Sequence, residues 1–352
     1  MYNICLLTNE NPYDHGLWLH SLDNSAGVKS YDVISLASHD WLDRIKQKDY
    51  HLFLAKPPGM TALYKQLYDE RINIIDQVLK APLYPTAQEI FIYENKRFFY
   101  SWLEANNLPH PRTHVFFSRK EAETFADHAD YPLVAKVNIG ASGSGVSVLN
   151  DKAQALKYIE QSFSSKGAPR RWGPNLSKGN LLRRGFHYVL NPGDIRKKVN
   201  KYSTVRADKQ RDFVIFQDFI PHDFEWRIVA IGGSYFAHKK LKIGEKASGS
   251  TLKQYDNPPV RLFDFAKGIM DRFGFVSQAI DVFETKEGQL LINEMQCIFG
   301  QSDPYQMLVD GKPGRYVFQD GHWVFEEGDF SSNESFDLRL ETAIELYEKG
   351  RL

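Results

Sequence analysis

Two strands joined by a short turn are predicted within QAIDVFETKEGQLLINEMQ, residues 278–296. Apolar residues dominate both Gln278–Phe283 and Gln289–Met295, and the polar stretch between them contains a glycine, as is typical of a hairpin. Asp281 interrupts the first run and Glu294 the second, so two adjacent strands present two carboxylates. Two facing carboxylates repel each other unless a cation lies between them.

This pair of carboxylates suggests a magnesium site. Mg²⁺ prefers oxygen ligands and usually takes one or two carboxylates together with phosphates of the substrate. The candidate metal ligands are Asp281, Glu294 and the amide oxygen of Gln296, and we expect two ions, with Mn²⁺ as a substitute for Mg²⁺. Glu294 and Gln296 share a strand face because side chains alternate along a strand. The alternative is a pair of edge-strand carboxylates in solvent.

A strand that ends at a proline precedes this hairpin, in FQDFIPHDFEWRIV, residues 216–229. Such an end exposes backbone N–H and C=O groups that can contact an adenine edge. The candidates for this contact are Gln217, Asp218, Phe219 and Ile220. Glu225 can accept hydrogen bonds from ribose hydroxyls, and Arg227, on the same strand face, can point at phosphates or at an acyl phosphate.

Three lysines lie close together on the following predicted strand, at positions 239, 240 and 242. Side chains alternate along a strand, so the three cannot all face one way. We therefore expect Lys240 or Lys239 to contact phosphate and the remaining lysines to be solvated.

A glycine-serine turn, GASGSG at residues 140–145, lies between two apolar runs. Its glycines let backbone N–H groups approach a phosphate, and its serines add hydroxyl donors, so Ser142, Gly143 and Ser144 are candidate phosphate contacts. Most turns of this kind are only hairpins. Lys136 strengthens the phosphate interpretation, because a lysine inside an apolar strand is costly to bury without an anionic partner.

Short apolar runs alternate with amphipathic stretches over the first ninety-odd residues, which predicts a small parallel α/β unit. We expect one domain over residues 1–95 and a second over residues 96–352. The second would contain a lid at about 131–221 and a catalytic sheet at about 222–305. Residues 164–212 are rich in Lys and Arg and are interpreted as a basic insertion beside the site, or else as a solvated loop region.

Composition excludes several classes of protein. The 352 residues include 44 Lys+Arg and 44 Asp+Glu, so no global field favours nucleic acid. No apolar run approaches the ~20 residues that span a bilayer, and the N-terminal residues lack the pattern of a signal peptide. Cys5 and Cys297 match no metal-ligand spacing, so we expect buried thiols in a cytoplasmic protein. A homodimer is compatible with the sequence.

Taken in order, these features resemble the ATP-grasp superfamily over roughly residues 80 to 305. Lys96, before a predicted helix, resembles the first phosphate lysine of the family, and Lys136 resembles the second. Residues 140–145 resemble the loop over the triphosphate. Residues 217–220 resemble the adenine-contacting hinge, with Glu225 in the ribose position, and Asp281, Glu294 and Gln296 match the magnesium ligands.

The sequence also departs from the family pattern. The third metal ligand is usually Asn, and here it is Gln296, which is one methylene longer. Many relatives carry an arginine two residues before the aspartate, where this chain has Ala279. Arg227, or Lys239 and Lys240, would then supply that positive charge.

The resemblance implies an α/β (α+β) protein with the ATP-grasp fold and an N-terminal Rossmann-like domain. It also implies a carboxylate-amine ligase that uses ATP and Mg²⁺. ATP would phosphorylate a small-molecule or peptide carboxylate, and an amine would attack the acyl phosphate to give an amide-type bond, ADP and phosphate. Tailoring of peptides or surface polysaccharides is a setting in which such ligases occur.

Two other functions remain open. A kinase with the same fold would phosphorylate a hydroxyl and release ADP without free phosphate. A protein without catalytic activity would bind a nucleotide as a sensor, or bind RNA through residues 164–212, although the neutral net charge argues against general RNA binding.

Overall fold

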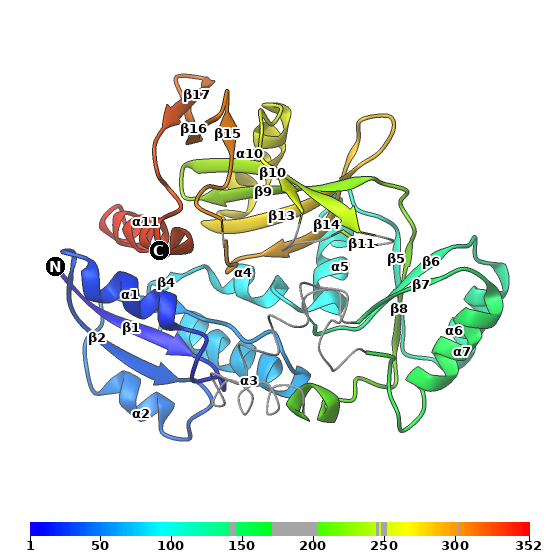
Figure 1. Ribbon diagram of the computed structural model, residues 1–352. Coiled ribbons are helices and arrows are strands. Elements are labelled where there is room, and N and C mark those ends of the chain that lie inside the picture. The colour runs from blue at the N-terminus through cyan, green and yellow to red at the C-terminus, as the bar shows by residue number, and fades with distance from the viewer. Residues whose placement is uncertain (141–144, 171–202, 244–245, 248–251, 302) are drawn as a thin grey trace, which may run out of the picture. The chain divides into compact units, whose positions relative to one another are not determined.

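Figure 1 shows the computed structural model, which describes residues 1–140, 145–170, 203–243, 246–247, 252–301 and 303–352. The chain divides into two compact units. Unit 1 consists of Met1–Pro58, Tyr64–His110 and Ile220–Leu352, and unit 2 consists of Gly59–Leu63 and Pro111–Phe219. Most of the expected basic insertion, residues 171–202, lies outside the described residues.

Unit 1 begins with a parallel sheet whose strand order is β2-β1-β3-β4. Its strands are β1 (Tyr2–Thr8), β2 (Val28–Ser35), β3 (Leu52–Ala55) and β4 (Leu83–Tyr84). The helices of this region are α1 (Gly16–Asn24), α2 (Trp41–Lys46), α3 (Ala62–Asn73), the π-helical η1 (Ile74–Val78), α4 (Ala87–Ile92) and α5 (Lys96–Ala105). The central strand β1 is apolar without alternation and is buried from Ile4 to Thr8, as expected for a strand covered on both faces. The predicted parallel α/β arrangement of the N-terminal residues is confirmed.

The last helix of the chain packs on this first sheet. Helix α11 (Phe336–Glu348) follows the short helix η2 (Ser332–Ser335). Its buried residues Phe336, Leu340, Ala343 and Leu346 belong to the same apolar core as Ile4, Leu6 and Leu54. The N-terminal and C-terminal parts of unit 1 therefore share one core.

The second sheet of unit 1 is antiparallel and has the order β14-β13-β9-β10-β16-β15. Its elements are β9 (Phe224–Ile231), β10 (Ser234–Ile243), β11 (Lys246–Ala247), β12 (Lys253–Gln254), β13 (Ser277–Glu284), β14 (Leu290–Gln296), β15 (Leu308–Val309), β16 (Lys312–Gln319) and β17 (His322–Glu327). Strands β11 and β12 pair with β10, and β17 pairs with β16. Helix α10 (Arg261–Phe273) ends at Gly274, whose φ of 65° is the left-handed conformation that glycine adopts most easily. The predicted hairpin of residues 278–296 is confirmed as β13 and β14.

Unit 2 contains a small antiparallel sheet with the order β5-β8-β6-β7. The elements are β5 (Thr113–Phe116), α6 (Arg119–His128), β6 (Leu133–Lys136), β7 (Val146–Leu149), α7 (Lys152–Ser162) and β8 (Val214–Asp218). Its core includes Ala126 from α6, Ile159 from α7 and Phe216 from β8. Together with unit 1, this mixture of parallel and antiparallel sheets confirms the expected α/β class.

Two composition-based expectations can be compared with the described residues. Both Cys5 and Cys297 are buried free thiols, as expected. Within the part of the chain that the structure describes, no helix has the length and apolar character needed to span a membrane.

A buried carboxylate joins helix α4 to the start of β13. Glu89 is completely buried and forms a capping box with Thr86 at the N terminus of α4. Its other oxygen accepts hydrogen bonds from the backbone N–H groups of Val276, at 3.0 Å, and Ser277, at 2.8 Å. Gln278 donates to the same oxygen at 3.2 Å. One side chain thus connects the helix to the strand that carries Asp281.

The stability of the fold is expected to depend on pH through Glu89. Burial raises the pKa of this carboxyl from 4.5 to about 7. Between these values the folded protein holds a proton that the unfolded chain releases. The stabilisation, about 3 kcal/mol at most, is therefore complete below pH 4.5 and is lost as the pH rises through 7. Urea unfolding of the wild type and of Glu89→Gln between pH 4.5 and pH 7 measures this change in stability. Parallel stability curves for the two proteins would contradict the assignment.

Candidate active site

Four strands of unit 1 place charged side chains on one face of the antiparallel sheet. Asp281 on β13 lies directly opposite Glu294 on β14 and opposite Arg227 on β9. Glu225, two residues before Arg227, pairs in register with Lys240 on β10. Directly opposed residues of neighbouring strands share a sheet face, as do residues two apart on one strand. The sequence placed Asp281 and Glu294 on adjacent strands, and the structure shows that they are direct partners.

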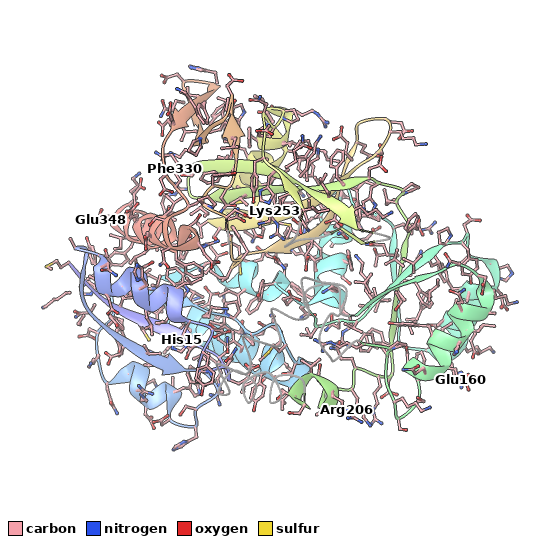
Figure 2. The ribbon with its side chains drawn as sticks, in the orientation of Figure 1. His15, Glu160, Arg206, Lys253, Phe330 and Glu348 are labelled. Atoms are coloured by element: carbon pink, nitrogen blue, oxygen red, sulfur yellow. The ribbon has the colours of Figure 1, made fainter. Side chains whose placement is uncertain are left out.

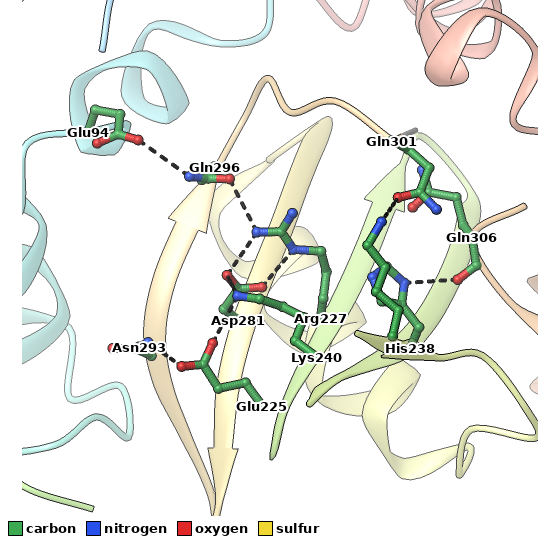
Figure 3. A network of polar contacts seen from close by, with 11 residues as sticks. Glu94, Glu225, Arg227, His238, Lys240, Asp281, Asn293, Gln296, Gln301 and Gln306 are labelled. Atoms are coloured by element: carbon green, nitrogen blue, oxygen red, sulfur yellow. Dashed lines mark hydrogen bonds and ion pairs between the residues drawn. The ribbon is translucent and has the colours of Figure 1, made fainter. Parts of the chain in front are cut away.

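Asp281 is the centre of this arrangement (Figure 3). Its side chain is 1% exposed. Arg227 donates to both carboxylate oxygens, from Nε at 2.8 Å and from Nη2 at 2.9 Å, and Lys240 Nζ donates at 2.7 Å. Burial by itself would raise the pKa of Asp281, but the positive charges of Arg227 and Lys240 outweigh burial and hold the pKa well below its usual range. Asp281 is therefore ionised together with two buried cations.

Lys240 connects Asp281 to a second carboxylate. Its Nζ also donates to Glu225 at 2.9 Å, and Glu225 accepts a further hydrogen bond from Asn293 Nδ2 at 3.3 Å. Burial opposes the charge of Lys240, but the two carboxylates raise its pKa above the usual value. Glu225 is positioned by an ammonium group on β10 and an amide group on β14, and its role toward ribose stays a prediction.

The other side of the network reaches helix α5 (Figure 3). Gln296 accepts from Arg227 Nη2 at 3.4 Å and donates to Glu94 Oε1 at 3.4 Å. Glu94 lies 3.6 Å from the ammonium of Lys96, the first residue of α5. Burial opposes the charge of Lys96, but Glu94 and Glu294 raise its pKa. Lys96 is thus electrostatically coupled to the carboxylates of the sheet.

Sequence reasoning missed Glu94 and Asn293. Glu94 is 4% exposed and has a φ of 52°, a conformation that non-glycine residues adopt only at an energetic cost. Its position two residues before Lys96 was the only signal in the sequence. Asn293 neighbours Glu294, but its contact with Glu225 on another strand depends on the sheet.

The oxygen donors of this face match the chemistry of a hard cation. Asp281, Glu294 and Gln296 offer carboxylate and amide oxygens, the donors that Mg²⁺ prefers. Across the described parts of the chain, the Glu294 carboxylate makes neither a hydrogen bond nor an ion pair, although it lies directly opposite Asp281. Both oxygens of Asp281 accept from Arg227, and Oδ2 also accepts from Lys240. Within the same ranges, no group of three or more His, Cys, Asp or Glu side chains is arranged for a metal ion. The donor types therefore fit Mg²⁺. In this structure the cations that contact Asp281 are the side chains of Arg227 and Lys240.

The structure distinguishes between two neighbouring lysines. Lys240 contacts Asp281, whereas Lys239 lies on the opposite face of β10. The ammonium of Lys239 is 4.4 Å from the ring centre of Phe224 and 5.0 Å from that of Trp226, which places it over two aromatic faces. Of the two lysines expected near phosphate, only Lys240 joins the network around Asp281.

Unit 2 carries the remaining nucleotide candidates. Lys136 at the end of β6 is 6% exposed and pairs in register with Ile215. Gln217 lies two residues farther along β8, on the same face, and donates to Thr113 Oγ1 at 3.0 Å. The other candidates are Asp218, which is exposed at the end of β8, Phe219, which follows it, and Ile220, the first residue of the last segment of unit 1. Ser142, Gly143 and Ser144 lie outside the described residues.

Comparison with known proteins identifies the fold. No protein-family model and no curated protein sequence matches the chain. The structure of D-alanine–D-alanine ligase from Bacillus anthracis complexed with ATP matches with a TM-score of 0.55 at 12% identity, over 100% of this chain and 99% of that chain. N5-carboxyaminoimidazole synthetase from Staphylococcus aureus complexed with ADP matches with a TM-score of 0.55 at 9% identity, over 97% and 77%. A RimK domain ATP-grasp protein from Sphaerobacter thermophilus matches with a TM-score of 0.50 at 17% identity, over 83% and 90%. These structural matches establish a common fold, and such low sequence identities say nothing about substrates.

Proposed function

The chain has the ATP-grasp fold, and we propose that it is an ATP-dependent carboxylate-amine ligase. The observation that carries the proposal is the network around Asp281. In it, Arg227 and Lys240 place two buried positive charges on the sheet face that also carries Glu294. Phosphoryl transfer depends mainly on positioning and on neutralising negative charge, and this face provides both.

The proposed reaction has two steps. An oxygen of the substrate carboxylate attacks the γ-phosphorus of ATP, and ADP leaves with the electron pair of the broken P–O bond. The nitrogen of an amine then attacks the acyl carbon, phosphate leaves, and the nitrogen loses a proton. Arg227 and Lys240 would hold the negative oxygens of the transferred phosphoryl group and of the acyl phosphate, because both cations are already oriented by Asp281.

Mg²⁺ would be held by Asp281, Glu294 and Gln296. When bound, Mg²⁺ neutralises phosphate charge. Lys96 and Lys136 would bind phosphates, Glu225 the ribose, and residues 217–220 the adenine. An ATP-consuming reaction and two free thiols are both consistent with a cytoplasmic protein.

Replacing Lys136 with Met is expected to weaken ATP binding about tenfold to a hundredfold. A hydrogen bond to a charged group contributes about 1.5–3 kcal/mol, and Met keeps the length of the side chain without its charge. Titration of the protein with ATP by calorimetry measures the change. The matched control is Lys152→Met, which removes an exposed lysine of the same unit that pairs with Asp127 at 2.9 Å. Equal effects of the two substitutions would contradict the role of Lys136.

The overall proposal is tested by ATP turnover against pooled carboxylates and amines, with product masses and free phosphate measured together. A condensed product with equimolar phosphate supports the ligase. A phosphorylated product without free phosphate would replace it with a kinase. ATP binding without turnover across a broad panel would favour a nucleotide-binding protein without catalytic activity.

A further inference from the structure

A second ionic pair lies on the same face of the antiparallel sheet, beyond β10. Lys253 on β12 pairs in register with Lys240 and therefore shares its face (Lys253 is labelled in Figure 2). Its ammonium donates to Asp303 Oδ2 at 2.7 Å and to Gln301 Oε1 at 2.8 Å. The Lys253 side chain is 8% exposed, whereas that of Asp303 is 42% exposed. The pair is thus buried on the lysine side and open to solvent on the aspartate side.

A neutral histidine lies on the same face of the sheet, beside the Asp281 network. His238 lies opposite Arg227 in register, and its ring centre is 5.0 Å from that of Tyr255. Its Nδ1 lies 3.0 Å from the carbonyl oxygen of Gln306, so Nδ1 carries the proton (Figure 3). Burial and the neighbouring cations Arg227 and Lys253 lower the pKa of His238 to about 3. This face of the sheet therefore carries the charged Asp281 network, a neutral histidine and a second charged pair.

Polar side chains fix both members of the pair. Gln301 is 4% exposed and donates to Tyr255 Oη at 3.2 Å and to the Tyr305 carbonyl at 2.6 Å. Tyr255 donates to Asp303 Oδ2, the oxygen that also accepts from Lys253. The hydrogen bonds from Lys253 and Tyr255 lower the pKa of Asp303, so the carboxylate is charged at neutral pH. The pair is a fixed positive and negative charge separated by one hydrogen bond.

A strained segment near the C terminus holds the loop that carries Gln301. Asn333, Glu334 and Ser335 are three consecutive non-glycine residues with φ of 49°, 54° and 62°. Such left-handed residues cost free energy and persist only where surrounding contacts require them. The required contact is visible here, because the Glu334 carboxylate accepts from the backbone N–H of Gln301 at 2.9 Å. A Cβ atom on Gly300 would lie 2.7 Å from the same carboxylate, which would then have to shift.

A buried arginine on α11 also holds the loop that carries Gln301. Arg339 on α11 is completely buried and donates to the carbonyl oxygens of Phe299 and Glu334, each at 3.2 Å. Its guanidinium lies 4.2 Å from the ring centre of Phe299. Both ends of the contact between the strained segment and the loop are therefore anchored. The strained segment therefore supports the loop whose Gln301 accepts from Lys253, and backbone strain of this kind is common at binding sites.

We infer that Lys253 and Asp303 bind the amine substrate, and that this substrate is a zwitterion with adjacent carboxylate and ammonium groups, as in an α-amino acid. The inference rests on the proposed ligase function. Lys253 binds the carboxylate and Asp303 the ammonium, so the ligand replaces the contact between the two side chains. A ligand with one charge leaves the other member of the pair without its partner, which disfavours binding. Neutral His238 lets the zwitterion approach Arg227 without adding positive charge.

The test compares three ligands in the absence of ATP. Ligand-observed NMR first finds the best binder among free amino acids. Its affinity is then compared with those of its amide, which lacks the carboxylate, and of its deaminated acid, which lacks the ammonium. For the wild type we expect the amino acid to bind at least about tenfold tighter than either analogue. This comparison needs no variant and is independent of ATP turnover.

Variants assign each charge to its partner. Lys253→Met should weaken amino-acid binding about tenfold to a hundredfold and strengthen binding of the amide, because no lysine is then left without its partner. Asp303→Asn should weaken amino-acid binding to a similar extent and strengthen binding of the deaminated acid, because no carboxylate is then left without its partner. The matched controls are Lys312→Met and Glu327→Gln, which disrupt an exposed pair with an N–O distance of 2.8 Å and should change no affinity.

Several outcomes would overturn the inference. They are the absence of amino-acid binding, equal binding of the three ligands, and variants that weaken all three ligands alike. Amino-acid binding by a protein that never turns over ATP would keep the zwitterion site and remove the proposed ligase. ATP-dependent condensation of amines that lack a carboxylate, with no binding of amino acids, would keep the ligase and remove the zwitterion site.

Discussion

Replacing Asp281 with Asn is expected to lower the rate of ATP-dependent phosphate release about 10²- to 10³-fold, the range found when one electrostatic group is removed from an active site. Asn keeps the shape of the side chain and removes its charge. Arg227 and Lys240 would then lose the carboxylate that orients them, and the candidate magnesium site would lose one of its two carboxylates. The effect therefore combines a misplaced pair of cations with weaker metal binding.

Single-turnover measurements at saturating ATP and Mg²⁺ separate this effect from a change in substrate affinity. Breaking a buried ion pair costs about 3–5 kcal/mol, so folding of the variant is checked by its unfolding transition and rates are compared well below it. The control is Asp271→Asn, which removes an exposed carboxylate of the same unit that pairs with Lys267. A rate within about threefold of the wild type would show that Asp281 has no part in the reaction.

The largest effect on stability is expected for Glu89→Ala, which should lower the free energy of unfolding by about 3–5 kcal/mol. The carboxylate is completely buried, and its removal leaves the backbone N–H groups of Thr86, Val276 and Ser277 without their acceptor. It also removes the capping box of α4. The loss occurs at the junction of α4 and β13, so both sheets of unit 1 should lose stability together.

Urea unfolding at pH 7 measures this loss from the transition midpoint and slope. Glu121→Ala is a matched control, because Glu121 occupies the same third position of helix α6, where its backbone N–H donates to the capping Ser118. Its side chain is exposed, so a loss within about 0.5 kcal/mol is expected there. A loss of 1 kcal/mol or less for Glu89→Ala would mean that the buried hydrogen bonds contribute little net stability.

Local pattern was sufficient for much of this protein. The hairpin of residues 278–296 was predictable because apolar runs and a glycine-containing turn depend on neighbouring residues only. Local pattern also accounts for helix α10, Arg261–Phe273, because its apolar residues follow the helical period and Gly274 ends it. The ATP-grasp fold was predicted from the resemblance of the ordered residue motifs to that superfamily, and the likeness to solved structures confirms it.

Other features required the tertiary structure. Because side chains alternate along a strand, the sequence places Lys239 and Lys240 on opposite faces of β10. Only the register of β10 against β9 shows that Lys240 is the one that contacts Asp281. The sequence predicted a cation at Asp281 and nominated Mg²⁺, whereas the structure brings the cations of Arg227 and Lys240 to it. These contacts join residues more than forty positions apart along the chain, which no local pattern reports.

The sequence by itself therefore determined the elements, their order and the type of chemistry available to the two carboxylates, because backbone preference and burial act over short distances. Only the tertiary structure decided which charges meet. It placed the pair of Lys253 and Asp303 beside His238, and it brought the strained Glu334 to the loop at Gln301. Electrostatic and hydrogen-bond energies depend on distances of a few ångströms between atoms, and for residues far apart in the chain those distances are set by strand register and packing.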